Sequence, residues 1–176
     1  MKTHAALVLL VPALFMISRS HLGAQRETGP AGVPNYTRVD ATVACAGATP
    51  VESLAELKQN GFASVINFRM PEEKGANIDE SKAMAAKIGL RYIHLPLQTP
   101  TPAIAEAFLK AVADPANQPA YIHCASANRV GAMWFIKRVK LDGWDTDRAM
   151  KEAELIGLRS PALKTFALDY VSGKAK

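Results

Sequence analysis

The chain has 176 residues and a formal net charge of +5, with 49% apolar and 21% charged residues. This length suits one domain with a hydrophobic core, and the composition excludes disordered, collagen-like and coiled-coil chains. Aromatic residues make up only 7% of the chain, which gives no sign of a stacking surface for single-stranded nucleic acid. There is also no block of Lys and Arg, so we expect no nucleic-acid partner.

Residues 1–24 are predicted to be a secretory signal peptide. A short basic start precedes an apolar run over 5–17, and Gly23 and Ala24 are small residues suited to cleavage. As a helix this run is roughly 20 Å long, shorter than the ~30 Å hydrocarbon core of a bilayer, so an uncleaved membrane anchor is the weaker alternative. We therefore expect an exported protein, periplasmic or secreted, with no stable membrane insertion after cleavage.

The remaining chain is predicted to alternate between strands and helices. Residues 25–35 are rich in Gly and Pro and are expected to be a flexible leader, and the domain is expected to span 36–173. Strands are predicted over 38–43, 63–68, 90–95 and 119–124, and helices over 49–60, 78–88, 101–113, 129–141, 145–156 and 161–171. Helix-length connections between strands indicate a single α/β domain with a mostly parallel central sheet flanked by helices.

The segment after the strand at 119–124 carries the strongest sign of chemistry. Cys124 ends that strand and Arg129 begins the next helix; the residues between them are Ala125, Ser126, Ala127 and Asn128. Backbone amides of a tight loop at a helix N-terminus bind anions, and the same field favours a thiolate at Cys124. The planar guanidinium of Arg129 can hold two oxygens of an oxyanion. This pattern indicates phosphoryl or sulfur transfer, with a buried structural cysteine as the alternative.

The run from His123 to Arg129 resembles the signature of the cysteine-dependent protein tyrosine and dual-specificity phosphatases. The segments Val65–Arg69 and Gly89–Pro96 precede it in the order of that superfamily, and the resemblance covers roughly 36–160. The chain is most similar to the bacterial beta-lactamase-hydrolase-like branch, also described as phosphatase-like sulfur transferases. The resemblance implies a dual-specificity-phosphatase-like fold with Cys124 as nucleophile and Arg129 as phosphate clamp. It also implies that His123 tunes the thiol and that the amides of 125–129 bind the oxyanion.

Three positions depart from the phosphatase signature. Four residues separate Cys124 from Arg129 where the signature has five, and four is the spacing of rhodanese-type sulfurtransferases. Ala127 stands at the usual glycine position, where a left-handed backbone would be strained. Val130 replaces a Ser or Thr that helps the thiolate leave a phosphocysteine. Anion binding is therefore better supported than turnover.

Residues outside the loop are interpreted more conservatively. Arg69 either faces the site and holds substrate or pairs with Glu72 or Glu73 as a structural clamp, and the pairing is favoured. No metal ion or other cofactor is expected, because two Cys and two His remain after cleavage without a C-x-x-C spacing. A Cys45–Cys124 disulfide is disfavoured, because the two strands are not expected to be neighbours.

In the phosphatases that the chain resembles, an acid before the cysteine strand protonates the leaving oxygen. The segment over 95–102 that should carry it contains no Asp or Glu. The nearest upstream acids can substitute only if their loop folds over the site; they are Glu72, Glu73, Asp79 and Glu80. Without such an acid, kcat/KM should fall steeply as the pKa of the leaving group rises.

The leading hypothesis is an exported phosphatase-like hydrolase that cleaves phosphate monoesters of a small molecule or protein through a phosphocysteine at Cys124. A rhodanese-like sulfurtransferase with a persulfide on the same cysteine is the alternative, and a non-catalytic phospho-ligand-binding module is the third. The candidate substrate-binding residues are His123, Ala125, Ser126, Ala127, Asn128, Val130 and Arg69. The sequence does not indicate an oligomeric state.

Overall fold

Six strands form one mixed sheet in the computed structural model, which describes residues 23–175. The strands are β1 (Gln25–Arg26), β2 (Thr37–Arg38), β3 (Val43–Ala46), β4 (Ser64–Asn67), β5 (Arg91–His94) and β6 (Ala120–His123). Their spatial order is β1-β2-β3-β6-β4-β5. The pairs β3–β6, β6–β4 and β4–β5 are parallel, whereas β1–β2 and β2–β3 are antiparallel. The predicted single α/β domain with a mostly parallel sheet is confirmed. Except for Gly23 and Ala24, the predicted signal peptide lies outside the described residues.

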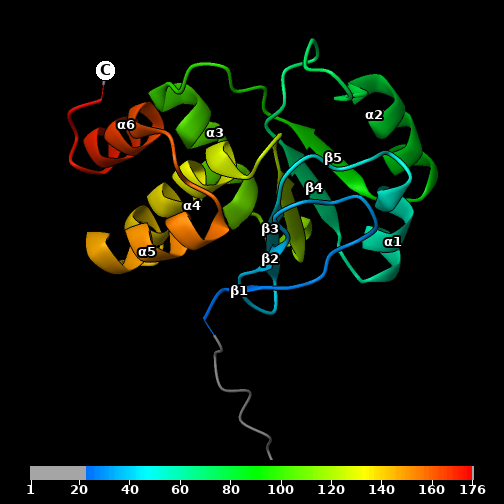
Figure 1. Ribbon diagram of the computed structural model, residues 1–176, viewed down its shortest axis with the longest axis horizontal. Coiled ribbons are helices and arrows are strands. Elements are labelled where there is room, and N and C mark those ends of the chain that lie inside the picture. The colour runs from blue at the N-terminus through cyan, green and yellow to red at the C-terminus, as the bar shows by residue number, and fades with distance from the viewer. Residues whose placement is uncertain (1–22, 176) are drawn as a thin grey trace, which may run out of the picture.

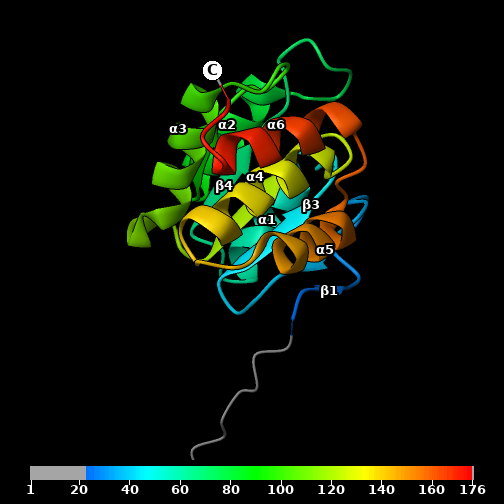
Figure 2. The same cartoon turned by 90° about the vertical axis from the view of Figure 1, so that its left-hand side faces the viewer.

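Helices cover both faces of the sheet (Figures 1 and 2). One face carries α1 (Ser53–Gln59) and α2 (Ile78–Lys87); the other carries α3 (Pro102–Ala113), α4 (Asn128–Lys140), α5 (Thr146–Ile156) and α6 (Pro161–Val171). A single 3-10 turn, Pro115–Asn117, precedes β6. Because strand side chains alternate between faces, β6 contributes Tyr121 to the core beneath α1 and α2 and Ile122 to the core around α4. Helix α4 is the central helix of that second core.

The starts of three helices follow from capping residues that the sequence contains. Thr101 accepts a hydrogen bond at its side chain from the Ile104 amide, and Pro102 is the first residue of α3. Asp145 caps α5 through the Arg148 amide at 2.8 Å. Ser160 caps α6 in the same way. Side-chain oxygens satisfy amides that have no partner within the helix, and proline has no amide to satisfy there.

The predicted strand over 38–43 is wrong, because most of this segment forms a hairpin turn between β2 and β3. Asp40 Oδ1 accepts hydrogen bonds from the amides of Thr42 at 2.8 Å and Val43 at 3.0 Å. An aspartate that binds amides two and three residues further on favours a turn over an extended strand. The strand that enters the parallel part of the sheet is therefore the later segment Val43–Ala46.

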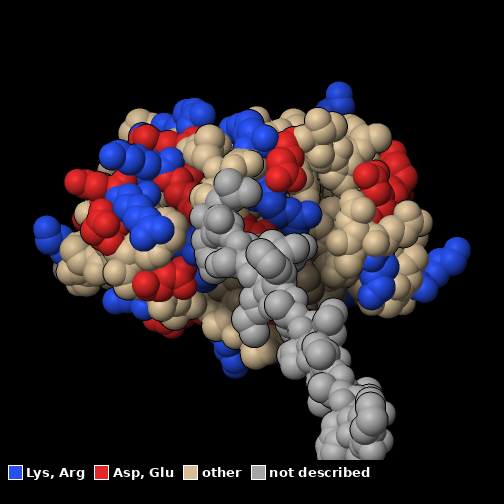
Figure 3. All heavy atoms as spheres, turned by 90° about the horizontal axis from the view of Figure 1, so that it is seen from below, with Lys and Arg blue, Asp and Glu red and all other residues tan. Residues whose placement is uncertain are grey.

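Residues 25–35, treated above as a leader, lie against the domain in the structure. Strand β1 pairs with β2, and the Arg26 guanidinium donates to Asn35 Oδ1 at 2.6 Å and to the Leu155 carbonyl at 2.8 Å. No helix within residues 23–175 is both long and apolar enough to cross a membrane. Where the described residues are visible in Figure 3, basic and acidic side chains are interspersed on the surface.

Candidate active site

The site lies at the edge of the sheet where the parallel strands end. His123, the last residue of β6, is in register with Ala46 of β3 and Asn67 of β4. In parallel α/β sheets, ligands bind in the crevice outside these carboxyl ends. The loops that follow β3, β6, β4 and β5 therefore lie along one edge of the sheet, and the cysteine loop lies between the loops that follow β3 and β4.

Cys124 lies at the base of the loop that joins β6 to α4. It is fully buried, and its amide donates to the Ala46 carbonyl of the neighbouring strand at 3.4 Å. The next two carbonyls are bound on the outer side of the loop: that of Ala125 by the Ala48 amide and that of Ser126 by the Asn35 side chain, at 2.9 and 3.2 Å. These contacts hold the loop against Ala48, which follows β3, and against Asn35, which precedes β2.

The amides of this loop lie at the uncapped start of a helix. Within residues 23–175, the amide groups of 125–128 make no short hydrogen bond, although an isolated antiparallel bridge joins Ser126 to Gly47, and α4 begins at Asn128 without a side-chain cap. Uncapped amides at a helix N-terminus carry partial positive charge and bind phosphate-like groups. The predicted anion-binding loop therefore has the backbone arrangement that such binding requires.

Ala127 has a left-handed backbone, with φ of 66° and ψ of 3°. This is the position where the sequence analysis noted alanine in place of glycine. A non-glycine residue in this conformation costs about 1–2 kcal/mol. The loop therefore retains the backbone shape of a glycine turn at an energetic cost.

Arg129 reaches across the site and is held by Glu73. Its Nη1 donates to Glu73 Oε1 at 2.6 Å and its Nη2 to Glu73 Oε2 at 2.9 Å. Nη1 also donates to the carbonyls of Phe68 and Leu97, at 3.1 and 3.0 Å. The guanidinium lies beside the Cys124 thiol, so the predicted nucleophile and clamp are brought together.

Both side chains of the Arg129–Glu73 pair are charged. Partial burial alone would raise the pKa of Glu73, but hydrogen bonds from Arg129 and the Met70 amide outweigh it and lower the pKa to about 2. Burial likewise disfavours the charged form of Arg129, yet its contacts with Glu73 and Cys124 raise its pKa overall. Glu73 is therefore an ionised carboxylate at neutral pH that fixes the orientation of the guanidinium.

Arg69 makes its hydrogen bonds within its own loop. Its Nη1 and Nη2 donate to the carbonyls of Gly75 and Lys74, both at 2.7 Å, and its Nε donates to Glu73 Oε2 at 3.3 Å. The favoured interpretation of Arg69 as a structural clamp paired with Glu73 is confirmed. All three nitrogens of the guanidinium make hydrogen bonds within this loop, and a role of Arg69 in substrate binding stays a prediction.

His123 is buried and neutral. Burial, helped by the positive charge of Arg69, lowers its pKa to about 3. Its Nδ1 makes no hydrogen bond to any described residue. A neutral imidazole supplies no positive charge to the neighbouring Cys124, so any influence of His123 on the thiol does not come from an imidazolium ion.

The last two candidates of the loop point away from the anion site. Asn128 Oδ1 accepts from the amides of Arg159 and Ser160, at 3.0 and 3.2 Å, and so connects the loop to the start of α6. Val130 is fully buried in the core around α4. Both side chains therefore support the fold, and their role in substrate binding stays a prediction.

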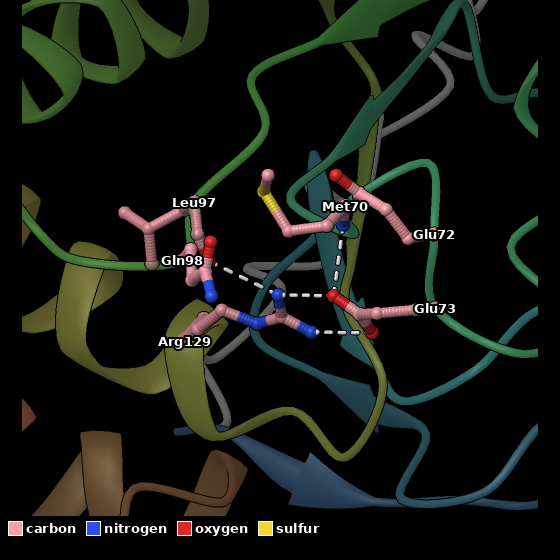
Figure 4. Close-up of a pocket in the computed structure, with 6 residues that line it drawn as sticks. All are labelled: Met70, Glu72, Glu73, Leu97, Gln98 and Arg129. Atoms are coloured by element: carbon pink, nitrogen blue, oxygen red, sulfur yellow. Dashed lines mark hydrogen bonds and ion pairs between the residues drawn. The ribbon is translucent and has the colours of Figure 1, made fainter.

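A pocket of about 440 Å³ opens over Arg129 (Figure 4). It is lined by Met70, Glu72, Glu73, Leu97, Gln98 and Arg129. The loop after β4 thus folds over the site, as it must if Glu72 or Glu73 is to replace the missing acid. Met70, Leu97 and Gln98 were not predicted, because nothing in their local sequence distinguishes them.

No group of three or more potential ligands for a metal ion occurs in the described part of the chain.

The domain has a fold similar to that of solved phosphatases. The chain belongs to the family of beta-lactamase hydrolase-like proteins, phosphatase-like domain, whose model matches residues 36–140. The family predicted from the cysteine loop is confirmed. A comparison with curated proteins found no match.

Solved structures show the same fold at low sequence identity. A DUF442 protein from Shewanella putrefaciens is 22% identical with a TM-score of 0.68, over 82% of this chain and 93% of that one. TpbA of P. aeruginosa in complex with pTyr is 22% identical with a TM-score of 0.64, over 89% and 92%. The core catalytic domain of the PP-IP phosphatase SIW14 from S. cerevisiae is 20% identical with a TM-score of 0.67, over 81% and 87%. At these identities the likeness establishes the fold alone.

Proposed function

We propose that this protein is a cysteine-dependent phosphatase that hydrolyses phosphate monoesters through a phosphocysteine at Cys124. The observation that supports this most directly is the loop from Cys124 to Arg129, where α4 begins without a side-chain cap and Glu73 holds the guanidinium along one edge. The phosphotyrosine bound by the structural neighbour TpbA is consistent with a phosphorylated substrate. We also propose that the protein is exported, on the signal-peptide pattern over 1–24; the mature N-terminus is the measurement that decides it.

The proposed reaction has two steps. The loop amides and Arg129 bind the phosphate oxygens, and the Cys124 thiolate attacks phosphorus while the bond to the ester oxygen breaks. That oxygen leaves with the bonding electron pair and takes up a proton. A water molecule then attacks the phosphocysteine, and Cys124 departs as a thiolate, which releases phosphate and restores the enzyme.

Turnover of p-nitrophenyl phosphate by the wild type and by Cys124→Ser tests the proposal. We expect Cys124→Ser to lower kcat by at least about 10³-fold, because the nucleophile is lost. Binding of inorganic phosphate, measured by calorimetry, should persist, since the amides and Arg129 remain. Cys45→Ala removes the other cysteine and serves as the control, with activity near that of the wild type. Full activity in Cys124→Ser would contradict the assignment of the nucleophile.

A sulfurtransferase is the second candidate, and two features of this segment favour it. Only four residues separate Cys124 from Arg129, and the buried Val130 offers no hydroxyl near the thiol. In this reaction the thiolate takes a sulfur atom from thiosulfate, releases sulfite and passes the sulfur to cyanide as thiocyanate. If the protein forms thiocyanate and releases no phosphate, it is a sulfurtransferase and the phosphatase proposal is wrong.

A further inference from the structure

One carboxyl group in the pocket over Arg129 is left without a role. Glu72 lines this pocket together with Glu73 and Arg129. It is exposed, and within the described chain its carboxylate makes no hydrogen bond or ion pair. In Figure 4, dashed lines join Glu73 to Arg129, whereas none reaches Glu72. A solvent-accessible carboxyl group therefore stands in the same pocket as the arginine that would hold the phosphate.

The other groups around the pocket cannot give a proton to a leaving oxygen. Glu73 is ionised, with a pKa of about 2, and both of its oxygens accept hydrogen bonds. Arg129 and Arg69 are charged guanidinium groups engaged with Glu73, and a guanidinium does not give up its proton near neutral pH. Lys74, the remaining charged side chain of the loop, is not among the residues that line the pocket. The facing wall, residues 95–101, contains no Asp, Glu or His.

The loop that carries Glu72 is fastened on both sides of this residue. Arg69 binds the carbonyls of Lys74 and Gly75, and the Met70 amide donates to Glu73 Oε1 at 2.8 Å. Glu73 in turn is joined to Arg129. The backbone of Glu72 is thus held at a constant position relative to the guanidinium, while its exposed side chain is free to change rotamer on a fast timescale.

We propose that Glu72 is the general acid and base of this site, an assignment that rests on the phosphatase activity proposed above. In the first step the Cys124 thiolate bonds to phosphorus and the phosphorus–oxygen bond to the leaving group breaks. The departing oxygen keeps the electron pair and takes the proton of Glu72, which becomes a carboxylate. In the second step Glu72 accepts a proton from the attacking water, the sulfur–phosphorus bond breaks, and the original protonation state returns.

The test compares a poor leaving group with a good one. We expect Glu72→Gln to lower kcat/KM on phenyl phosphate by about 10²-fold, and on p-nitrophenyl phosphate by less than about 3-fold, because nitrophenolate departs without a proton. Glu72→Asp, which keeps a carboxyl group, should recover part of the loss. Glu56→Gln, an exposed position on α1 outside the pocket, is the matched control.

Equal losses on both substrates, or no loss on either, would overturn the assignment of Glu72. In both cases p-nitrophenyl phosphate hydrolysis by the wild type, absent in Cys124→Ser, would leave the phosphatase proposal standing. Failure of the wild type on both substrates would instead contradict that proposal itself. The two ideas are therefore separated by one set of assays.

Discussion

The pairing of Arg129 with Glu73 determines which edge of the guanidinium is offered to a ligand. Nη1 is engaged by Glu73 and by the carbonyls of Phe68 and Leu97, and Nη2 gives one hydrogen to Glu73. A guanidinium has five N–H donors in one plane. The Nε–H and the second Nη2–H therefore remain, and together they form the fork that matches two oxygens of a phosphate. Glu73 acts through Arg129 and is a positioning residue.

The lowered pKa of Glu73 predicts how stability depends on pH. Above pH 4.5 the carboxylate is ionised in both states and the native pair contributes its full stabilisation. As the pH falls towards about 2, the unfolded chain binds a proton that native Glu73 does not, so acidification lowers the free energy of unfolding. We expect Glu73→Gln to lower this free energy by about 1–3 kcal/mol at pH 7, allowing for partial exposure of the pair, and by much less near pH 2.

Chemical denaturation at several pH values measures this difference. Glu72→Gln is the control, because Glu72 has no partner within residues 23–175 and its replacement should have a small effect that does not vary in this way. A Glu73→Gln effect that stays constant down to pH 2 would show that the native carboxylate is not stabilised by its partners.

The sequence identified some residues of the site and could not have identified others. Cys124 and Arg129 share one short segment, and Arg69 lies four positions from Glu73, so local spacing was sufficient for both pairs. The contact between Glu73 and Arg129 joins residues 56 positions apart. Such a contact depends on the order of strands in the sheet, which local spacing does not determine.

The turn between α5 and α6 packs closely against the cysteine loop. Gly157 is the C-cap residue of α5, and its φ is 151°. A Cβ at this position would lie 2.9 Å from Ala127 Cβ and 3.1 Å from the Ser126 carbonyl oxygen. Asn128 adds two hydrogen bonds to the same turn. The left-handed conformation of Ala127 is thus maintained by neighbouring elements, as strained backbone in a native structure requires.

Gly157→Ala is expected to destabilise the protein by about 2–4 kcal/mol, because the new methyl group would meet the loop and the backbone angle is unfavourable for alanine. Gly143→Ala is the matched control: its φ is 68°, but a Cβ there meets nothing within 4 Å. Its cost should be only about 1 kcal/mol. Thermal unfolding gives both values, and equal effects of the two variants would show that the contact with the loop is unimportant.

Secondary structure could be predicted where single residues impose it. Thr101-Pro102 and Ser160-Pro161 marked helix starts that the structure places at Pro102 and Pro161. Strand β1 has two residues, too few for any hydrophobic alternation, and it forms only because β2 offers it an edge. The turn at Asp40 was missed because the apolar alternation around it resembles that of a continuous strand.

At the scale of the whole molecule, the order of the strands changes the argument about the two cysteines. Strands β3 and β6 are neighbours, so the reason given above against a Cys45–Cys124 disulfide is wrong. The register supplies a different reason. Cys45 lies opposite Ile122, which places Cys124 two residues further along. With about 4.8 Å between strands and 3.3 Å per residue, the Cα atoms should be roughly 8 Å apart, beyond the range of a disulfide.

We therefore expect both thiols to stay reduced even if the protein is exported to an oxidising compartment. Cys45 is fully buried, and burial raises the pKa of its thiol well above the usual value, which slows thiol exchange. Intact-mass spectrometry of the exported protein, alkylated in denaturant without reductant, should show two modified cysteines and an N-terminus at Gln25. Alkylation of the Cys45→Ala variant, with one modified cysteine, calibrates the mass increment. A wild-type chain that takes up no alkylating agent until it is reduced would show that the two strands move enough to join Cys45 to Cys124.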